Sequence, residues 1–270
     1  MHEANRITVN TSISEDLVRN RTMLSKATIK FVQLLKDKKN RQEHGLFLVE
    51  GNKTVAELLA SNLKVKTLFA TERWLRDYHE LLKTDTVFEK VSDIELKKLS
   101  NLVTPQDVVA LVEMPGNKFD SSKITNSFSI ALDGIQDPGN FGTILRIADW
   151  YGIQNIICSP QCADVYNPKV IQSAMGSFIR VNVFYTSLNH FFEANKNIQV
   201  YGAVMNGDDL YTSKINSNGI LLIGNEGSGI SEDLNKFVTK ALTIPRKGNA
   251  ESLNAAIATA IICDAWARGH

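Results

Sequence analysis

The sequence has few cysteines, no long apolar run and almost no net charge. Its three cysteines, Cys158, Cys162 and Cys263, cannot form an even framework of disulfides. A single C-x3-C spacing is weak evidence for a metal site, so we expect buried or half-buried thiols and no metal. No apolar run approaches the roughly 18 to 20 residues of a membrane span, and the first residues lack the apolar core of a signal peptide. We therefore expect a soluble, cytoplasmic protein.

Charge is balanced over the whole chain but concentrated near its beginning. The 270 residues carry 30 Lys and Arg against 29 Asp and Glu, a formal net charge of +1. Between Arg19 and Arg41 there are eight basic residues and one acid, Asp37. The same segment has apolar residues at helical spacing and is closed by Gly45. Such a cluster binds phosphates without sequence preference, although a solvated helix face would explain it equally well.

Alternating helix and strand patterns divide the chain into two α/β domains. Residues 1–20 are polar and without periodicity, so we expect a loosely ordered extension of unreadable function. Residues 21–114 alternate helical patterns with short apolar strands, which predicts a small three-layer domain. The stretch 115–127 combines Pro, Gly, Asn and paired Ser and is the predicted linker. Residues 128–270 form the second domain.

The second domain is predicted to contain a mainly parallel sheet with helices on both faces, and no internal repeat is present. Its apolar strand patterns are 129–135, 155–159, 178–184, 198–204, 219–224 and 240–245. The last segment, Leu253 to Trp266, is apolar around most of its circumference and must therefore be buried. It either threads the core or packs against a second subunit.

The first of three informative motifs is PGNFGTILR, residues 138–146. Pro138 and Gly139 are turn residues and Asn140 is a suitable helix N-cap, so a capped helix alone would explain them. Arg146 lies in the first turns of the same helix, at the sheet edge where α/β proteins usually bind ligands. Its planar guanidinium suits a bidentate contact with phosphate.

The second motif, IGNEGSGIS, covers 223–231 and follows an apolar strand. Its glycines let the backbone approach a ligand closely, and Ser231 can cap the next helix. The order G-x-x-G-x-G differs from the dinucleotide fingerprint, and the motif is not in the first βα unit of its domain. Nicotinamide or flavin binding is therefore disfavoured. Glu226 taken alone could be a solvated loop charge.

The third motif, IPRKGNAESLN, covers 244–254 and joins a strand to the last helix, which we expect to begin at Glu251. Free backbone N–H and C=O groups in such a loop can bind an adenine edge without charged side chains.

Together the three motifs resemble those of the SpoU family, the RNA 2'-O-ribose methyltransferases of the SPOUT class. The resemblance implies a deep trefoil knot in the catalytic domain, S-adenosylmethionine as methyl donor, no metal, and a homodimer with the site near the subunit interface. It implies catalytic roles for Asn140, Arg146, Glu226, Ser252 and Asn254. It implies cofactor contacts at Gly224, Asn225, Gly229, Ile244 and Leu253. Arg246 stands where methionine is common in the family, and we interpret it as variation at the cofactor-pocket rim or in RNA contact.

The proton of a ribose hydroxyl is very weakly acidic, so the reaction must manage its departure. Histidine is an unsuitable candidate for the base, because all five lie outside the motifs: His2, His44, His79, His190 and His270. The family's proposed base is Arg146, but a guanidinium gives up its proton only at high cost. Our hypothesis is that Arg146 holds the phosphate beside the target ribose and polarises the 2'-hydroxyl.

The basic segment resembles the RNA-binding domain that precedes many SpoU catalytic domains. Its pattern is SKxxxKxxxxLxxKKxRxxxGxFxxEG, beginning at Ser25. The resemblance implies a ribosomal-protein-like α/β fold that contacts RNA through Lys26, Lys30, Lys36, Lys38, Lys39 and Arg41. It favours large-subunit ribosomal RNA over tRNA, because the simplest tRNA ribose methylases of the family lack this domain. A tRNA enzyme and a non-catalytic RNA-binding or ribosome-assembly protein remain alternatives, and the sequence does not identify the target nucleotide.

Overall fold

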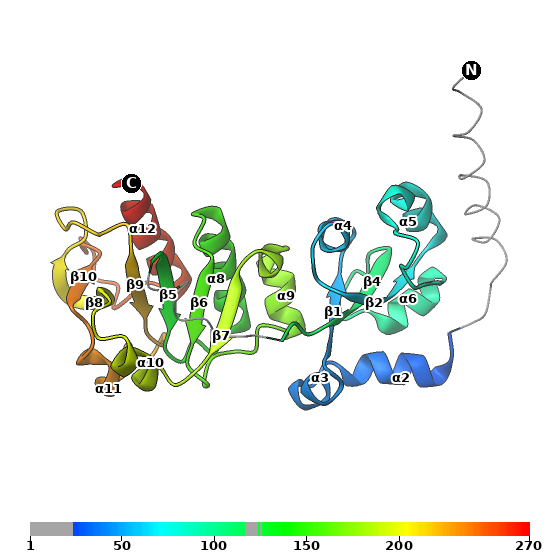
Figure 1. The fold of residues 1–270 in the computed structure, drawn as a ribbon, viewed down its shortest axis with the longest axis horizontal. Helices are drawn as coiled ribbons and strands as arrows, with labels where there is room; N and C mark the ends of the chain where they lie inside the picture. Colours follow the sequence, from blue (N-terminus) through cyan, green and yellow to red (C-terminus); the bar gives the residue numbers. More distant parts are fainter. Residues whose placement is uncertain (1–23, 117–123, 125) are drawn as a thin grey trace, which may run out of the picture. The chain divides into compact units, whose positions relative to one another are not determined.

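The computed structural model describes residues 24–116, 124 and 126–270. The chain falls into two compact units, one ending at Met114 and one beginning at Pro115 (Figure 1). The predicted extension at 1–20 and most of the predicted linker lie outside the described residues. Within the described ranges, no helix is both long and apolar enough to cross a membrane.

The first unit contains a four-stranded mixed sheet in the order β1-β4-β2-β3. Its strands are β1 (Leu46–Glu50), β2 (Val65–Ala70), β3 (Phe88–Lys90) and β4 (Val108–Glu113). Because β4 is antiparallel to both β1 and β2, these two strands end at the edge where β4 begins. These short strands lie within residues 21–114, where the sequence predicted alternating helices and short apolar strands.

The helices of the first unit are short. They are α2 (Lys26–Leu34), α3 (Lys38–His44), α4 (Asn52–Leu59), α5 (Glu72–Asp77), α6 (Asp93–Leu99) and the 3-10 turn η1 (His79–Leu81). The basic segment is thus two helices, and Gly45 ends the second in the left-handed conformation, φ 62°. Buried apolar residues such as Val32 and Leu96 pack the helices against the sheet residues Leu48 and Phe69.

Arg41 corrects one sequence prediction, because its side chain is buried, 1% exposed. Its Nη1 donates to the carbonyl oxygens of Leu35 at 2.8 Å and Lys36 at 2.6 Å. These carbonyls follow α2, where the last turn of a helix lacks backbone partners. Arg41 therefore fastens the turn between α2 and α3 and does not face RNA. The predicted basic residues that stay exposed are Lys26, Lys30, Lys36, Lys38 and Lys39.

The second unit contains a six-stranded sheet in the order β10-β8-β9-β5-β6-β7, and every pairing is parallel. Its strands are β5 (Phe128–Leu132), β6 (Asn155–Cys158), β7 (Asn182–Tyr185), β8 (Val200–Asp209), β9 (Gly219–Ile223) and β10 (Lys240–Thr243). The predicted parallel α/β fold is confirmed.

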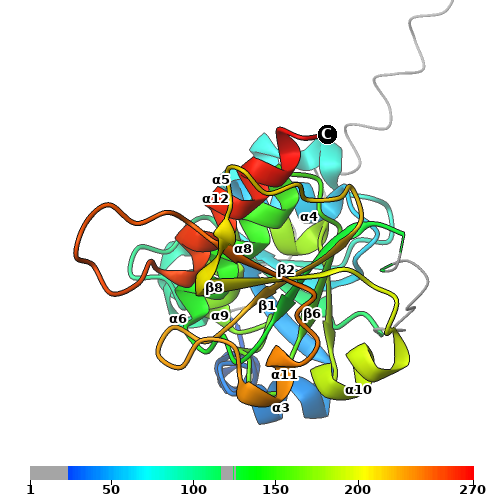
Figure 2. The same cartoon turned by 90° about the vertical axis from the view of Figure 1, so that its left-hand side faces the viewer.

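Helices cover both faces of this sheet (Figure 2). Their bounds are α8 (Pro138–Trp150), α9 (Pro168–Ala174), η2 (Ser177–Ile179), α10 (Leu188–Ala194), α11 (Glu232–Asn235) and α12 (Ala255–Ala267). Phe191, Phe192 and Leu234 pack α10 and α11 onto one face. On the other face, α8 contacts both α9 and α12.

Helix α12 differs from its prediction in start and burial. It begins at Ala255, and the side chain of the N-cap residue Asn254 accepts hydrogen bonds from the first turn, so Glu251 is not its start. Ile262 and Cys263 are buried, whereas Ile257 is 53% exposed. The helix therefore buries one side in this chain and leaves apolar surface on the other.

Candidate active site

The three motifs leave the sheet at one edge. In a parallel sheet all strands end on the same side, and ligand sites form there. The first motif follows β5, the second follows β9 and the third follows β10. Figure 2 shows the loops after β9 and β10 projecting in the same direction. A cavity of about 610 Å³ opens at the other end of the strands, beside Gln199 and Gly219, and contains no motif residue.

The first motif begins its helix differently from the prediction. Pro138 is the first residue of α8, and the N-cap is Asp137, whose Oδ1 accepts from the Asn140 backbone N–H at 2.7 Å. The prediction that Asn140 is the N-cap is therefore wrong. The pair Asp137–Pro138 carries the usual signal for this start, since proline is favoured at the first helical position. The Asn140 side chain is left for other partners.

A chain of hydrogen bonds joins one residue from each motif. The Asn140 Nδ2 donates to Glu226 Oε1 at 2.7 Å, and the Asn254 Nδ2 donates to Asn140 Oδ1 at 2.8 Å. The Asn254 Oδ1 also accepts from the backbone N–H groups of Ala256 and Ile257 at the start of α12. Three of the five residues predicted to be catalytic are thus connected, and their relative positions are fixed.

The second motif is a loop folded back on its own strand. Asn225 and Gly229 exchange backbone hydrogen bonds of 3.0 and 2.9 Å, and Gly229 has φ 69°. A Cβ atom on Gly224 would lie 2.1 Å from the Gly229 carbonyl carbon, so only glycine fits there. The Asn225 Nδ2 donates to the Gly134 carbonyl at 2.7 Å, which ties this loop to the segment between β5 and the first motif.

Ser231 occupies the N-cap position of α11 as predicted, but its side chain makes no capping hydrogen bond. Its backbone N–H instead donates to Asp133 Oδ2 at 2.8 Å. Asp133 was not among the predicted site residues, because it fell inside the predicted strand 129–135. The strand β5 ends one residue earlier, at Leu132, which places Asp133 on the ligand edge.

Arg146 and Ser252 lie outside this hydrogen-bond chain. Arg146 is exposed on α8 and forms no hydrogen bond or ion pair with any residue in the described ranges. Ser252 is exposed in the loop before α12, and neighbouring Leu253 is 47% exposed. The guanidinium of Arg146 is therefore available to an anionic ligand.

The third-motif loop offers unpaired backbone groups. Between Ile244 and Leu253, within the described chain, no backbone N–H donates to another backbone carbonyl. Arg246 stabilises the loop from inside, because its Nη1 donates to the Ala250 carbonyl at 3.0 Å. A loop of this kind fits the adenosine part of S-adenosylmethionine, which needs backbone donors and acceptors rather than charge.

A further segment of this edge, residues 203–207, escaped the sequence analysis. Strand order places β8 between β9 and β10, and the β8–β10 register jumps from Gly202 opposite Ala241 to Asp208 opposite Leu242. Thr243 Oγ1 fastens the extra residues, donating to the Val204 carbonyl at 3.0 Å and accepting from the Gly207 N–H. No local pattern predicts this bulge, because it depends on which strands are neighbours.

The cysteines are buried, as expected. A hydrogen bond with Cys158 lowers the pKa of the Cys162 thiol to about 7, while burial raises that of Cys158 well above its usual value. Ser159 links this region to the site, since its Oγ accepts from the Gly134 N–H at 2.9 Å. Among the described residues, no group of three or more His, Cys, Asp or Glu could hold a metal ion.

Two family models match this chain. Residues 127–264 match the SpoU rRNA Methylase family, and residues 26–110 match the MRM3-like substrate binding domain. Each match falls within one of the two compact units.

Relatives and solved structures agree with these matches. The 23S rRNA (guanosine(2553)-2'-O)-methyltransferase RlmP of Bacillus subtilis is 31% identical over 231 residues, covering 84% of this chain and 91% of its own. A TrmH-family protein structure from Porphyromonas gingivalis is 36% identical, covering 92% of this chain and 99% of its own, with a TM-score of 0.83. The SpoU methyltransferase AviRb of Streptomyces viridochromogenes, solved with AdoMet, is 28% identical, covering 90% and 98%, with a TM-score of 0.78.

Proposed function

Because this chain belongs to the SpoU rRNA methylase family, we propose that it transfers the methyl group of S-adenosylmethionine to a ribose 2'-hydroxyl of large-subunit ribosomal RNA. The observation that carries the proposal is the Glu226–Asn140–Asn254 hydrogen-bond chain, which joins all three family motifs at the ligand edge. RlmP of Bacillus subtilis, which is similar along most of this chain, is named as a 23S rRNA 2'-O-methyltransferase.

S-adenosylmethionine supplies, when bound, an activated methyl group on a sulfonium centre. We assign its binding to the second- and third-motif loops; in the third, no backbone N–H between Ile244 and Leu253 donates to a described backbone carbonyl. The contacting residues in this proposal are Gly224, Asn225, Gly229, Ile244 and Leu253. The unpaired N–H groups of the third loop support the assignment, as does the second loop, which is held in one shape by the Asn225–Gly229 bridge and leaves the same edge of the sheet.

In this proposal, the side chains of the three motifs align the reactants and bind the RNA acceptor. Asn140, Glu226 and Asn254 hold the three loops in fixed relative positions, which keeps donor and acceptor aligned and can supply several kcal/mol toward the barrier. Arg146, exposed and without an internal partner, binds the phosphate beside the target ribose and polarises the 2'-hydroxyl. Ser252 shapes the acceptor side of the pocket from the loop before α12.

The first unit presents the RNA. Its exposed lysines on α2, on α3 and in the turn between them supply positive charge that attracts the phosphate backbone without reading sequence. They are Lys26, Lys30, Lys36, Lys38 and Lys39. An enzyme of ribosomal RNA works where that RNA is assembled, and we place this protein in the cytoplasm.

We further infer a homodimer and a deep trefoil knot in the second unit. Helices α8 and α12 run side by side, joined at their starts by Asn140 and Asn254 and near their ends by Tyr151 and Asp264. On them Trp150 is 84% exposed and Ile257 is 53% exposed. A second copy covering this face would bury apolar surface beside the site. The knot rests on similarity to SpoU folds.

The deciding experiment measures transfer of radiolabelled methyl from S-adenosylmethionine to total RNA from a strain that lacks this gene, followed by mapping of the 2'-O-methyl nucleotide. We expect label in large-subunit rRNA that is lost in the Arg146→Ala variant. Label in tRNA would overturn the substrate. No label, despite measurable cofactor binding, would favour a non-catalytic RNA-binding protein.

A further inference from the structure

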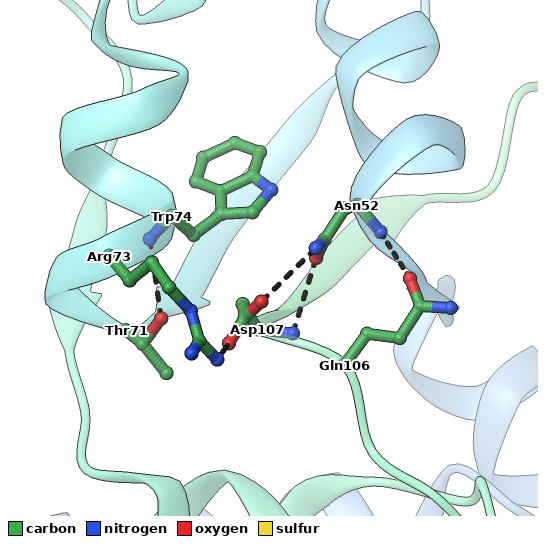
Figure 3. A network of polar contacts seen from close by, with 6 residues as sticks. All are labelled: Asn52, Thr71, Arg73, Trp74, Gln106 and Asp107. Carbon is green, nitrogen blue, oxygen red and sulfur yellow. Dashed lines mark hydrogen bonds and ion pairs between the residues drawn. The ribbon is translucent and has the colours of Figure 1, made fainter.

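The first unit has an ordered polar surface at the sheet edge where β1 and β2 end and β4 begins. This edge differs from the lysine-bearing surface, since α3 leads into the start of β1, at the other end of that strand. Asp107, just before β4, is at its centre. Its side chain accepts from Asn52 Nδ2 at 3.1 Å and from Arg73 Nη2, and its backbone N–H donates to Asn52 Oδ1 at 3.2 Å (Figure 3).

These bonds fix the position of the exposed groups around Asp107. The hydrogen bond from Arg73 lowers the pKa of the Asp107 carboxyl, so this acid stays ionised and compensated near neutral pH. The Arg73 side chain is still 63% exposed. Gln106 Oε1 accepts from the Asn52 N–H at 2.7 Å, which leaves the Gln106 Nε2 without a partner in the described chain (Figure 3).

A fastened loop lies beside this network. Glu50, the last residue of β1, accepts hydrogen bonds from Ser100 Oγ and from the Asn101 N–H and Nδ2, the last two at 2.9 and 3.0 Å. The Leu102 N–H donates to Ser100 Oγ at 3.0 Å. Val103, the next residue, is completely solvent-exposed, 101%. An apolar side chain on a loop held at its base can meet a partner with little ordering cost.

We propose that this strand-end surface, made of Asn52, Lys53, Arg73, Val103 and Gln106, binds an unpaired segment of the RNA substrate; the proposal rests on the function proposed above. RNA is read chiefly where bases are unstacked, by contact with base faces and hydrogen bonds to base edges. Val103 offers the face contact and Gln106 the edge contact. Arg73 and Lys53, which is exposed and unpaired within the described residues, face phosphate.

In this proposal, the lysine-bearing surface and the strand-end surface of the first unit bind RNA in different ways. The lysines of α2, α3 and the turn between them form no side-chain hydrogen bond or ion pair with any described residue, which suits attraction of any RNA. The strand-end surface holds amide, guanidinium and apolar groups in one arrangement, which suits selection of a particular RNA shape. Substitutions on the two surfaces should therefore affect different terms of the binding reaction.

The test compares Val103→Ser and Lys53→Ala with two controls on the same unit, Val87→Ser and Lys66→Ala. Val87 is 58% exposed and precedes β3, and Lys66 is exposed near the start of β2, both away from this edge. The full-length proteins are titrated with protein-free large-subunit rRNA over a range of salt, with poly(A)–poly(U) duplex as competitor. Calorimetry with S-adenosylhomocysteine monitors the catalytic unit.

We expect Val103→Ser to weaken rRNA binding about fivefold, as for loss of a buried apolar side chain, with an unchanged salt slope. Lys53→Ala should lower that slope by about 1, the effect of one phosphate contact. Val103→Ser should reduce the preference for rRNA over the duplex. The two control variants should bind rRNA as wild type does, and the affinity for S-adenosylhomocysteine should equal that of wild type.

If wild type methylates rRNA but both variants bind it normally, the proposed function holds and this inference fails, leaving the surface to a protein partner. If wild type neither binds nor methylates rRNA, both fail.

Discussion

The Asn140 amide has both of its polar ends engaged within the site. Its Nδ2 faces Glu226 and its Oδ1 faces Asn254, so the orientation of the amide is determined by its partners. Asp137 is the N-cap of α8, although the Asn140 side chain would also suit that role. At the residue scale, Asn140 is therefore a connector between loops, and Arg146 is the cationic group of α8, with no partner among the described residues.

Replacing Arg146 with lysine keeps the charge but removes the planar fork. We expect kcat to fall roughly 10- to 100-fold, the loss of a charged hydrogen bond worth about 1.5–3 kcal/mol. The affinity for S-adenosylhomocysteine, measured by calorimetry, should stay at the wild-type value, because the proposed cofactor loops are untouched. Near-normal turnover would contradict a requirement for the guanidinium geometry.

Replacing Asn140 with aspartate places a second carboxylate where the amide nitrogen now lies 2.7 Å from Glu226 Oε1. Two carboxylates this close cannot both be ionised, so the pair should hold one proton with a raised apparent pKa. Activity should drop at pH 8 by about tenfold or more and recover partly as the pH falls and a proton bridges the pair. Asn140→Ala is the control, since it should lose activity at every pH. The same loss for both variants across the pH–rate profile would contradict the contact.

At the scale of elements, α8 connects the site to the rest of the second unit. Its first turn carries Asn140, and its next turn packs against α9 at Gly142. A Cβ atom on Gly142 would lie 2.4 Å from the Ser173 Cβ and 2.8 Å from the Val170 carbonyl oxygen. The second glycine of the PGNFG sequence therefore serves helix packing, which the sequence analysis did not foresee. Glycine here sets how closely α8 and α9 approach.

Gly142→Ala should separate α8 from α9 and lower stability by about 1–3 kcal/mol despite alanine's better helix propensity. Thermal unfolding monitored by circular dichroism measures the effect. The double variant Gly142→Ala with Ser173→Gly removes the closest of these clashes, the one with the Ser173 Cβ, and should regain part of the loss. An unchanged melting temperature in the single variant would contradict the close packing.

At the scale of the whole molecule, each unit has its own sheet and its own buried core. In the second unit, the parallel arrangement puts three loops that are far apart in sequence at one edge. The same arrangement lays α8 beside α12, with Trp150 and Ile257 exposed on them. The proposed homodimer would cover Ile257, in the first turn of α12 near Asn254, and Trp150, at the far end of α8.

Ile257→Glu should therefore convert the protein from dimer to monomer, because a charge in an apolar interface must be desolvated without a partner. Light scattering after size exclusion should give a mass near the 30.0 kDa of one chain. Val87→Glu, on the first unit, is the matched control and should stay dimeric. A wild-type protein that is monomeric at all concentrations would contradict the dimer.

The sequence by itself determined the element types, the parallel sheet and the motif loops, because hydrophobic periodicity and turn residues act over a few neighbouring positions. Strand 65–70 and the strand ending at Glu50 are local patterns of this kind. The resemblance of the motifs to those of the family also pointed to Asn140, Glu226 and Asn254, together with Arg146 and Ser252.

Only the tertiary structure decided which partners these side chains use. The Asn140 contacts span 86 and 114 residues of sequence. The buried Arg41 binds carbonyl groups that come together only in the turn after α2. The bulge at 203–207 exists because β8 lies between β9 and β10. Contacts of this kind depend on strand order and chain crossing, which no local pattern encodes.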